Sequence, residues 1–439
     1  MTDTSIFFFT AEDPSEIPRG SRDPLRFLPD WTAVGRRMIP CLTTVTPSYR
    51  GFLTRFLFHG ALEHIAPQLA HEKNDEQWKA FSKFEQLCGL VRANSQTQTP
   101  GFPGITGAID QKRLRNGRVY VGEKSDYWLM QSQRTTGFWG YYHQACRRSH
   151  LLKMNNAPQP GYLLSDSALQ VFDSSCAERL MTKTYRTQLE SLFKNKEIDF
   201  ELTEFEDLAR YFAYQPESNA DVYRKFWHDH LLIGPASSHT THNLELPKAF
   251  AQEVKRIVDQ HPNIHTNQIW EKLSSKAELS IVQPHAKSVL ATEAVIGLCE
   301  WLFDACRIRR LDGSFLSHTL NWAFDNGYNE NWKNSFNSLE SPSDSTLSGY
   351  RELILKGENG LETLARQLVD RHVTVMKSRK VAPWVELVDD RLHIRNPVNP
   401  PAPLDSNANT GVLWRNDYFL GSWLSVAKEL GYIRGNDDA

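Results

Sequence analysis

The spacing of apolar residues predicts a chain built mostly of helices. From Ser48 onward, apolar side chains recur every three or four residues, as they do along one face of a helix. Pro67 is expected to end or kink this helix, and a second one is predicted from Asp75 to about Ala93. Residues 176–310 then continue as one helix after another. Within them Val289–Ile308 is apolar almost all round, which predicts a buried central helix.

Two segments outside the predicted helices are predicted to form β-strands. In the Gly- and Pro-punctuated stretch 95–125, Asn116-Gly117 precedes a short strand, Arg118–Val121. Near the C-terminus, apolar residues alternate on both sides of Asp389-Asp390, which predicts a hairpin over 385–394.

Residues 135–172 read as helix, strand, loop, strand and helix. Thr135 or Thr136 is expected to cap the first helix. A strand then begins at Ser149, a Pro- and Gly-containing turn follows, and Tyr162 starts the returning strand. Ser165 is expected to begin the second helix. This order of elements within about 40 residues is that of a winged helix.

The remaining stretches complete the picture of the fold. The first 45 residues are expected to form an extended lead-in, and 338–347 a linker. Helices are predicted from Leu361 to Met376 and from about Asp417 to a terminating Gly431. The fold class is therefore mainly α with minor β. Four regions are expected: an N-terminal helical domain with its lead-in (1–130), a winged-helix-like module (131–180), a helical middle domain (181–340) and a C-terminal α+β cap (348–439).

Composition excludes disorder and indicates a cytoplasmic protein. Of the 439 residues, 40% are hydrophobic and 11% aromatic, more than enough for folded cores. The six cysteines are scattered without a CxxC pair, which is typical of reduced thiols. The N-terminus lacks the basic and apolar regions of a signal peptide. Acidic residues interrupt the most apolar window, 289–306, so no membrane partner is expected.

Positive charge is concentrated in one part of a nearly neutral chain. Between Gly101 and Lys153, nine basic residues stand against three acidic ones, although the whole chain carries a net charge of −2. Clustered cations favour phosphate binding, and the interleaved aromatic residues would suit stacking on bases. The alternative is a solvated charged surface over an aromatic core. The candidate nucleic-acid-binding residues are Lys112, Arg113, Arg115, Arg118, Arg134, Arg147, Arg148 and Lys153.

Two further clusters have weaker chemical meaning. Histidines gather at positions 228, 230, 239 and 242, where two or more rings would have to converge to hold a divalent metal. Ordinary capping and core roles are the more common explanation for histidines in such surroundings. Glu293, Glu300 and Asp304 share one stripe of the apolar helix, and such a stripe more commonly meets water or arginines than a substrate.

Motifs of common enzyme classes are absent from the sequence. It contains no phosphate-binding GxxxxGK[ST] loop, no GxGxxG, no GxSxG and no HExxH. Cys146 has two histidines near it in the sequence, His143 and His150. Both stand at helical spacing from it, which does not indicate a catalytic dyad. No catalytic residue, metal ligand or cofactor is therefore assigned.

Three stretches of the sequence have a family likeness. They are RGSRDPLRFLPDWTAVGRRMIPCLTTVT at 19–46, RTTGFWGYYHQACRRSHLL at 134–152 and KVAPWVELVDDRLHIRNP at 380–397. Together they resemble uncharacterised proteins of bacterial genomic defence islands. The resemblance implies a setting in anti-phage or mobile-DNA defence and a place as one subunit among several. It carries over no functional residue.

The sequence thus favours an accessory or recognition subunit of a defence complex. It is expected to contact DNA or RNA through the basic segment and other protein subunits through its helical surfaces. Two alternatives stay open: a metal-dependent hydrolase or nuclease using the histidines at 228–242, and a scaffold without a ligand.

Overall fold

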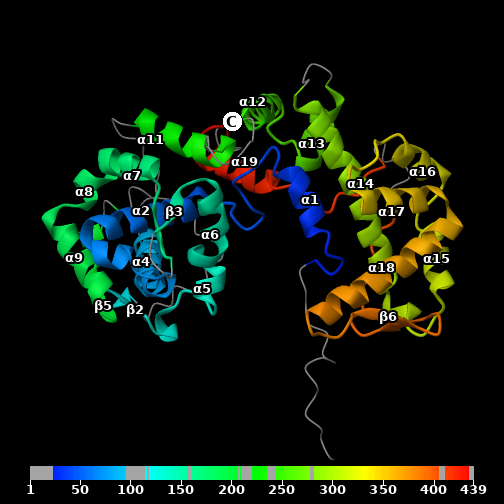
Figure 1. The fold of residues 1–439 in the computed structure, drawn as a ribbon, viewed down its shortest axis with the longest axis horizontal. Helices are drawn as coiled ribbons and strands as arrows, with labels where there is room; N and C mark the ends of the chain where they lie inside the picture. The colour runs from blue at the N-terminus through cyan, green and yellow to red at the C-terminus, as the bar shows by residue number, and fades with distance from the viewer. Residues whose placement is uncertain are drawn as a thin grey trace, which may run out of the picture. The chain divides into compact units, whose positions relative to one another are not determined.

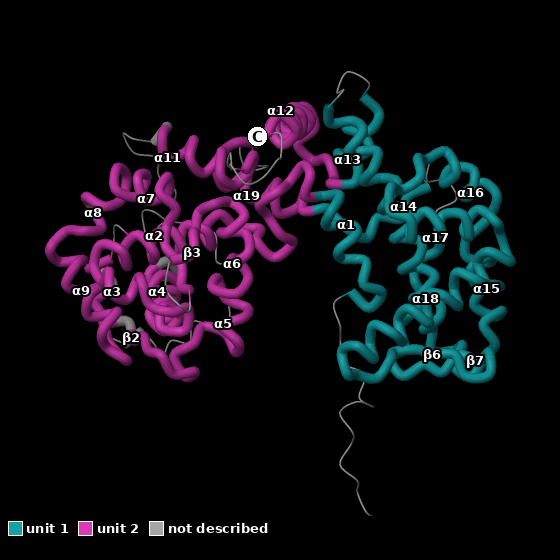
Figure 2. The backbone as a smooth tube through the Cα atoms, in the orientation of Figure 1, with its two compact units in different colours: residues 1–35, 267–418 teal, residues 36–266, 419–439 magenta. Residues whose placement is uncertain are grey.

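The computed structural model describes residues 23–94, 114–115, 118–155, 160–205, 208, 220–234, 244–276, 281–404 and 411–434. It is mainly helical with a few small sheets, which confirms the fold class expected from the sequence. The chain divides into two units, coloured in Figure 2: unit 1 comprises 1–35 and 267–418, and unit 2 comprises 36–266 and 419–439. Each unit is assembled from segments that are far apart in the sequence.

Unit 2 is organised around helix α2 (Tyr49–Ile65). Ser48 caps it by accepting a hydrogen bond from the main-chain N–H of Arg50. Every residue of α2 except Glu63 and His64 is buried, and the buried residues include the polar Arg50, Thr54, Arg55 and His59. Gly51 allows this, since a Cβ there would lie 2.3 Å from the Tyr142 ring. The sequence predicted that only one face of α2 is buried. The buried surface is wider than predicted, because neighbours cover α2 on all sides.

Several helices pack around α2 (Figure 1). Two of these helices are α4 (Asn74–Asn94) and α6 (Phe138–Arg148). Helix α4 matches the helix predicted from Asp75. Phe58 of α2 lies among the rings of Phe81, Phe84 and Phe193. The remaining helical elements of unit 2 are α3 (Pro67–Ala70), η2 (Ser125–Tyr127), α5 (Gln133–Thr136), α7 (Asp166–Phe172), η3 (Asp173–Ala177), α8 (Glu178–Leu180), α9 (Lys183–Lys194), η4 (Leu202–Phe205), α11 (Ala220–Trp227), η5 (His228–Ile233), α12 (Glu245–Gln260) and α19 (Leu420–Glu429).

Unit 2 also holds two of the small sheets. The predicted strand near Arg118 is β2 (Arg118–Gly122), and it pairs antiparallel with β1 (Leu114–Arg115). On its other side it pairs with β5 (Glu197–Glu201), in a stretch expected to be purely helical. The second sheet is formed by β3 (Leu152–Met154) and β4 (Tyr162–Leu164), in antiparallel register.

Unit 1 is built around α14 (Gln283–Ala305), the buried central helix expected from the sequence. The other helical elements of this unit are α1 (Leu28–Gly35), α13 (Thr266–Ser275, apart from its first residue), η6 (Arg309–Leu311), α15 (Leu316–Asp325), α16 (Glu330–Asn337), α17 (Ser345–Leu355) and α18 (Glu358–Ser378). The hairpin predicted around Asp389-Asp390 is confirmed as β6 (Val385–Val388) and β7 (Arg391–Ile394). Both turn residues have positive φ, as a tight hairpin turn requires.

Two expectations for unit 1 need correction. The lead-in was expected to be extended, but from residue 28 it forms α1, whose Trp31 and Val34 are buried. Asp23 prepares this helix by accepting the main-chain N–H groups of Phe27 and Leu28. The linker expected at 338–347 is shorter, because α17 already begins at Ser345 and is capped by Asp344.

Candidate nucleic-acid interface

The expected order of helix, two strands and helix is present in unit 2. Helix α6 leads into the β3–β4 hairpin, and α7 follows directly, capped by Ser165 through the N–H of Ala168. The first helix starts later than expected, because Thr135 and Thr136 belong to the short helix α5. In their place the Glu85 carboxylate of α4 accepts the N–H of Phe138 at 2.6 Å. The hairpin turn at 156–159 lies outside the described residues.

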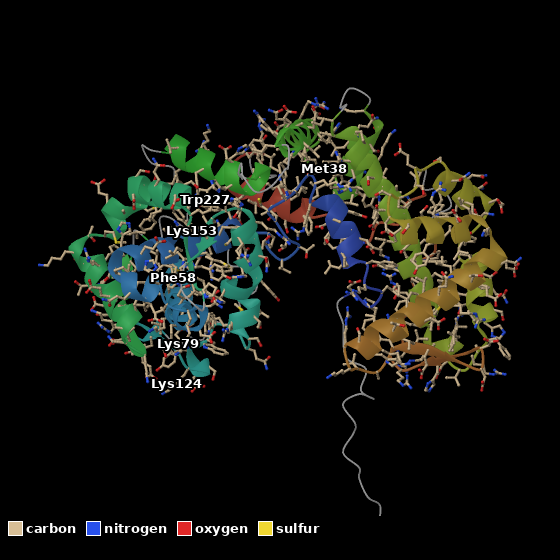
Figure 3. All side chains as sticks on the ribbon, viewed as in Figure 1. Met38, Phe58, Lys79, Lys124, Lys153 and Trp227 are labelled. Atoms are coloured by element: carbon tan, nitrogen blue, oxygen red, sulfur yellow. The ribbon has the colours of Figure 1, made fainter. Side chains whose placement is uncertain are left out.

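Three of the predicted nucleic-acid-binding cations, and Lys124 of the same basic segment, form ion pairs within unit 2. Arg118 binds Asp199 at 2.5 Å and Glu201 at 3.0 Å on strand β5. Arg134 pairs with Asp75. Lys124 pairs with Glu197 at 2.8 Å and Lys153 with Asp166 at 2.5 Å; Figure 3 labels both lysines. These pairs neutralise much of the local positive charge. Lys112, Arg113 and the side chain of Arg115 lie outside what the structure describes.

Arg147 and Arg148 are placed differently, at the end of α6 just before the hairpin. Both side chains are exposed. The main chain of Arg148 accepts a hydrogen bond from the Cys41 thiol, with a sulfur–oxygen distance of 3.6 Å, which brings the segment after Arg36 to this helix end. No carboxylate of the described residues forms an ion pair with Arg36, Arg147 or Arg148. We call these three residues the junction arginines.

The charges of the junction arginines act on one another. Burial, together with the nearby charge of Arg148, lowers the pKa of Arg36 to about 10. Arg148 is likewise subject to partial burial and to the charge of Arg147, which both lower its pKa. With a pKa of about 10, Arg36 nevertheless remains charged at neutral pH. Arg36 was not among the residues predicted from the sequence to bind nucleic acid. The adjacent basic pair Arg36-Arg37, within the stretch 19–46, could have indicated it.

The histidine cluster is only partly described, and the described members have other partners. Nδ1 of His230 donates to the carbonyl oxygen of Ser149 at 2.7 Å, and its ring packs on Phe226. His228 lies 3.3 Å from the Asp229 carboxylate, and its ring packs in a tilted arrangement against that of Tyr432. Positions 239 and 242 fall outside the described residues. Within the described part of the chain, no three potential ligands converge as a metal site would require.

The acidic stripe of α14 holds a loop in place in unit 1. Gly297 lets the loop come close, since a Cβ there would lie 1.9 Å from the carbonyl oxygen of Leu413. One turn earlier, the Glu293 carboxylate accepts the N–H groups of Arg415 and Asn416 and the hydroxyl of Tyr418. Asp304 pairs with Arg307 and Arg415. This geometry assigns the stripe a structural role.

Comparisons with known proteins give no relative for this chain. No family model, curated protein or solved structure matches it. Among the described residues, no helix is long and apolar enough to cross a membrane.

Proposed function

We propose that this chain is a recognition subunit of a bacterial anti-phage or mobile-DNA defence complex and contacts nucleic acid through the junction arginines. The supporting observation is that Arg36, Arg147 and Arg148 gather beside the β3–β4 hairpin without a carboxylate in ion-pair contact among the described residues. The defence setting, and the contacts with other subunits, rest on the three resembling stretches alone.

The electrostatics favour phosphate as the partner of these arginines. Like charges held together repel, and a polyanion relieves that repulsion while it releases its condensed counterions. The guanidinium group also matches phosphate oxygens with two parallel hydrogen bonds. The ion-paired cations Arg118, Arg134 and Lys153 contribute less, although exposed ion pairs of this kind are weak enough, at about 0–1 kcal/mol, to exchange partners.

A structural role for Arg147 and Arg148 is the competing explanation. Both lie in the last turn of α6, where a positive charge stabilises the helix end by about 0.3–1 kcal/mol. In that case their loss would lower stability and leave nucleic-acid binding unchanged. Stability and binding must therefore be measured on the same variants.

The test is the double variant Arg147→Gln/Arg148→Gln. The matched control is Arg309→Gln/Arg310→Gln, since these are also adjacent, exposed arginines, they lie in the other unit, and the change in net charge is the same. Binding of a fluorescently labelled DNA duplex, and of an RNA duplex of the same sequence, is titrated against salt. Each phosphate contact contributes about −0.9 to the slope of log affinity against log salt on duplex DNA.

We expect the junction variant to flatten that slope by roughly 2 and the control to leave it unchanged. Adding Arg36→Gln to the junction variant should reduce the magnitude of the slope by roughly 1 more. An equal slope in both double variants, or no binding by the wild type at low salt, would refute the proposal. A lower melting temperature with unchanged binding would assign Arg147 and Arg148 to the helix end and favour the scaffold.

A further inference from the structure

A completely buried arginine lies at the centre of unit 2. Arg55 of α2 is 0% exposed. Its guanidinium carbon stands 4.0 Å from the centre of the Trp139 ring and 5.1 Å from that of Phe81. Aromatic faces attract a cation, but they offer no hydrogen-bond acceptor comparable to an oxygen. The two rings hold the guanidinium in position without satisfying it.

None of the three guanidinium nitrogens has a hydrogen-bond partner in the described part of the protein. The same is true of both ring nitrogens of His59, one turn further along α2, which is also fully buried. The main chain of Tyr162 lies near His59 but outside hydrogen-bond geometry. Two neighbouring side chains of one helix thus present unused donors in the interior.

The nearby ionisable groups balance the charge of Arg55 only in part. The charge of the Glu85 carboxylate acts on Arg55, but its oxygens accept hydrogen bonds from the main-chain N–H of Phe138 at 2.6 Å and from Gln133 at 2.7 Å. Burial raises the pKa of Glu85 to about 7 and that of Cys146 to about 12, so the thiol is neutral at pH 7. Burial also lowers the pKa of His143 to about 4, which keeps that ring neutral.

Arg55 itself stays charged, because burial lowers its pKa only to about 10. A buried charge without a partner is among the most destabilising features a core can contain. Its planar fork of donors is suited to a group that presents two oxygens side by side. We propose that Arg55 and His59 bind one small oxyanion, of the carboxylate, sulfate or phosphate class, inside the core of unit 2.

The first test asks what the purified full-length protein contains. The protein is desalted into a chloride buffer free of oxyanions and then denatured. The released solution is analysed by ion chromatography and mass spectrometry. We expect about one equivalent of an oxyanion from the wild type and none from Arg55→Met, since an internal anion leaves only on unfolding. Arg50→Met is the control, because it removes an arginine from the same helix that already has a partner, Glu429.

The second test is thermal melting with added sodium formate, sulfate or phosphate at constant ionic strength. At about ten times its Kd, the correct anion should raise the melting temperature of the wild type and of Arg50→Met by roughly 3–6 °C. Arg55→Met should show no shift. Arg55→Lys, which keeps the charge but loses the planar fork, should show a smaller one and serves if the methionine variant does not fold.

The three anions distinguish the members of the class. Release of equal amounts from Arg55→Met and wild type would overturn the proposal. So would the absence of both a released oxyanion and an anion-specific shift in the wild type, which would leave water as the partner of these donors. Neither outcome bears on the junction arginines, whose readout is nucleic-acid binding.

Discussion

Arg50 and Glu429 form an ion pair at 2.8 Å across 379 residues of sequence. The same carboxylate accepts the main-chain N–H of Tyr49 at 2.7 Å and the Ser48 hydroxyl at 3.1 Å. Glu429 of α19 therefore neutralises the N-terminal end of α2, where a negative charge is favourable. The C-terminal segment is part of the core arrangement of unit 2.

Replacing Glu429 by alanine is expected to lower the free energy of unfolding by about 2–3 kcal/mol, because three donors lose a charged acceptor. Urea denaturation measures the loss. Glu253→Ala is the control: its side chain is equally buried and pairs with Arg256, but within one helix, so its loss should stay under about 1 kcal/mol. Equal losses in the two variants would contradict the role given to Glu429.

His372 should make unit 1 sensitive to acid. Its Nε2 accepts the N–H of Trp384 at 2.8 Å, so Nδ1 carries the proton and donates to the carbonyl oxygen of Pro24 at 3.2 Å. Burial lowers the pKa of this ring from 6.5 to about 4. The unfolded chain therefore binds more protons between those values, and stability falls as the pH drops from about 6.5 to about 4.

We expect this histidine to account for a loss of roughly 1–3 kcal/mol across that interval. In His372→Phe the corresponding part of the pH dependence should disappear, even if the variant is less stable at pH 7. Unfolding free energies of wild type and variant at several pH values provide the comparison. Parallel curves would show that His372 does not titrate in this way.

Glu300 should destabilise unit 1 at alkaline pH. Burial, together with the charge of Glu293 on the same stripe, raises the pKa of Glu300 to about 8. The folded state then binds more protons than the unfolded state between pH 4.5 and 8, so stability declines as the pH rises through that range. Glu300→Gln should be more stable than wild type at pH 9 by about 1–3 kcal/mol and similar near pH 4.

Thermal melts at the two pH values measure this difference. Glu352→Gln, an exposed glutamate of the same unit, is the control and should change little at either pH. A melting temperature of Glu300→Gln below that of wild type at pH 9 would mean that the charged carboxylate has a partner that stabilises it.

The cysteines should be unreactive until the protein unfolds. All six are buried free thiols, as the scattered spacing predicted. Burial raises the pKa of Cys41, Cys146 and Cys306 to about 12, so little of the reactive thiolate forms. A colorimetric thiol reagent should therefore react slowly with the native protein and with all six groups in denaturant. Rapid reaction of one thiol before unfolding would reveal an accessible site.

Local patterns in the sequence predicted the elements that depend on local chemistry. The hairpin around Asp389-Asp390 follows from alternation and from a turn that tolerates positive φ. Gly431, with φ of 66°, ends α19 as predicted. Strand β5 was missed because its acidic residues and short length carry no strand signal. Its partner, β2, lies about 80 residues earlier in the chain.

Contacts between residues far apart in the sequence explain which features of the candidate site could not be predicted. The basic residues could be read from the sequence, but not that Asp199, Asp75 and Asp166 neutralise Arg118, Arg134 and Lys153. The sequence pattern did not predict that Arg55 and His59 are buried, because polar residues at helical spacing are normally expected to face water. Only the packing of α4 and α6 around α2 reveals that both are enclosed.

The discontinuous construction of both units sets the order in which the protein can fold during synthesis. Domains that are continuous in sequence can fold as they leave the ribosome, N-terminal first. Here the loop held by Glu293 ends at Tyr418, and Glu429 lies later still, so neither unit can be completed before these residues have been synthesised. Ribosome-bound chains that stop before residue 411 should therefore expose the apolar surfaces of α2 and α14 to chaperones, and release of the full chain should remove that exposure.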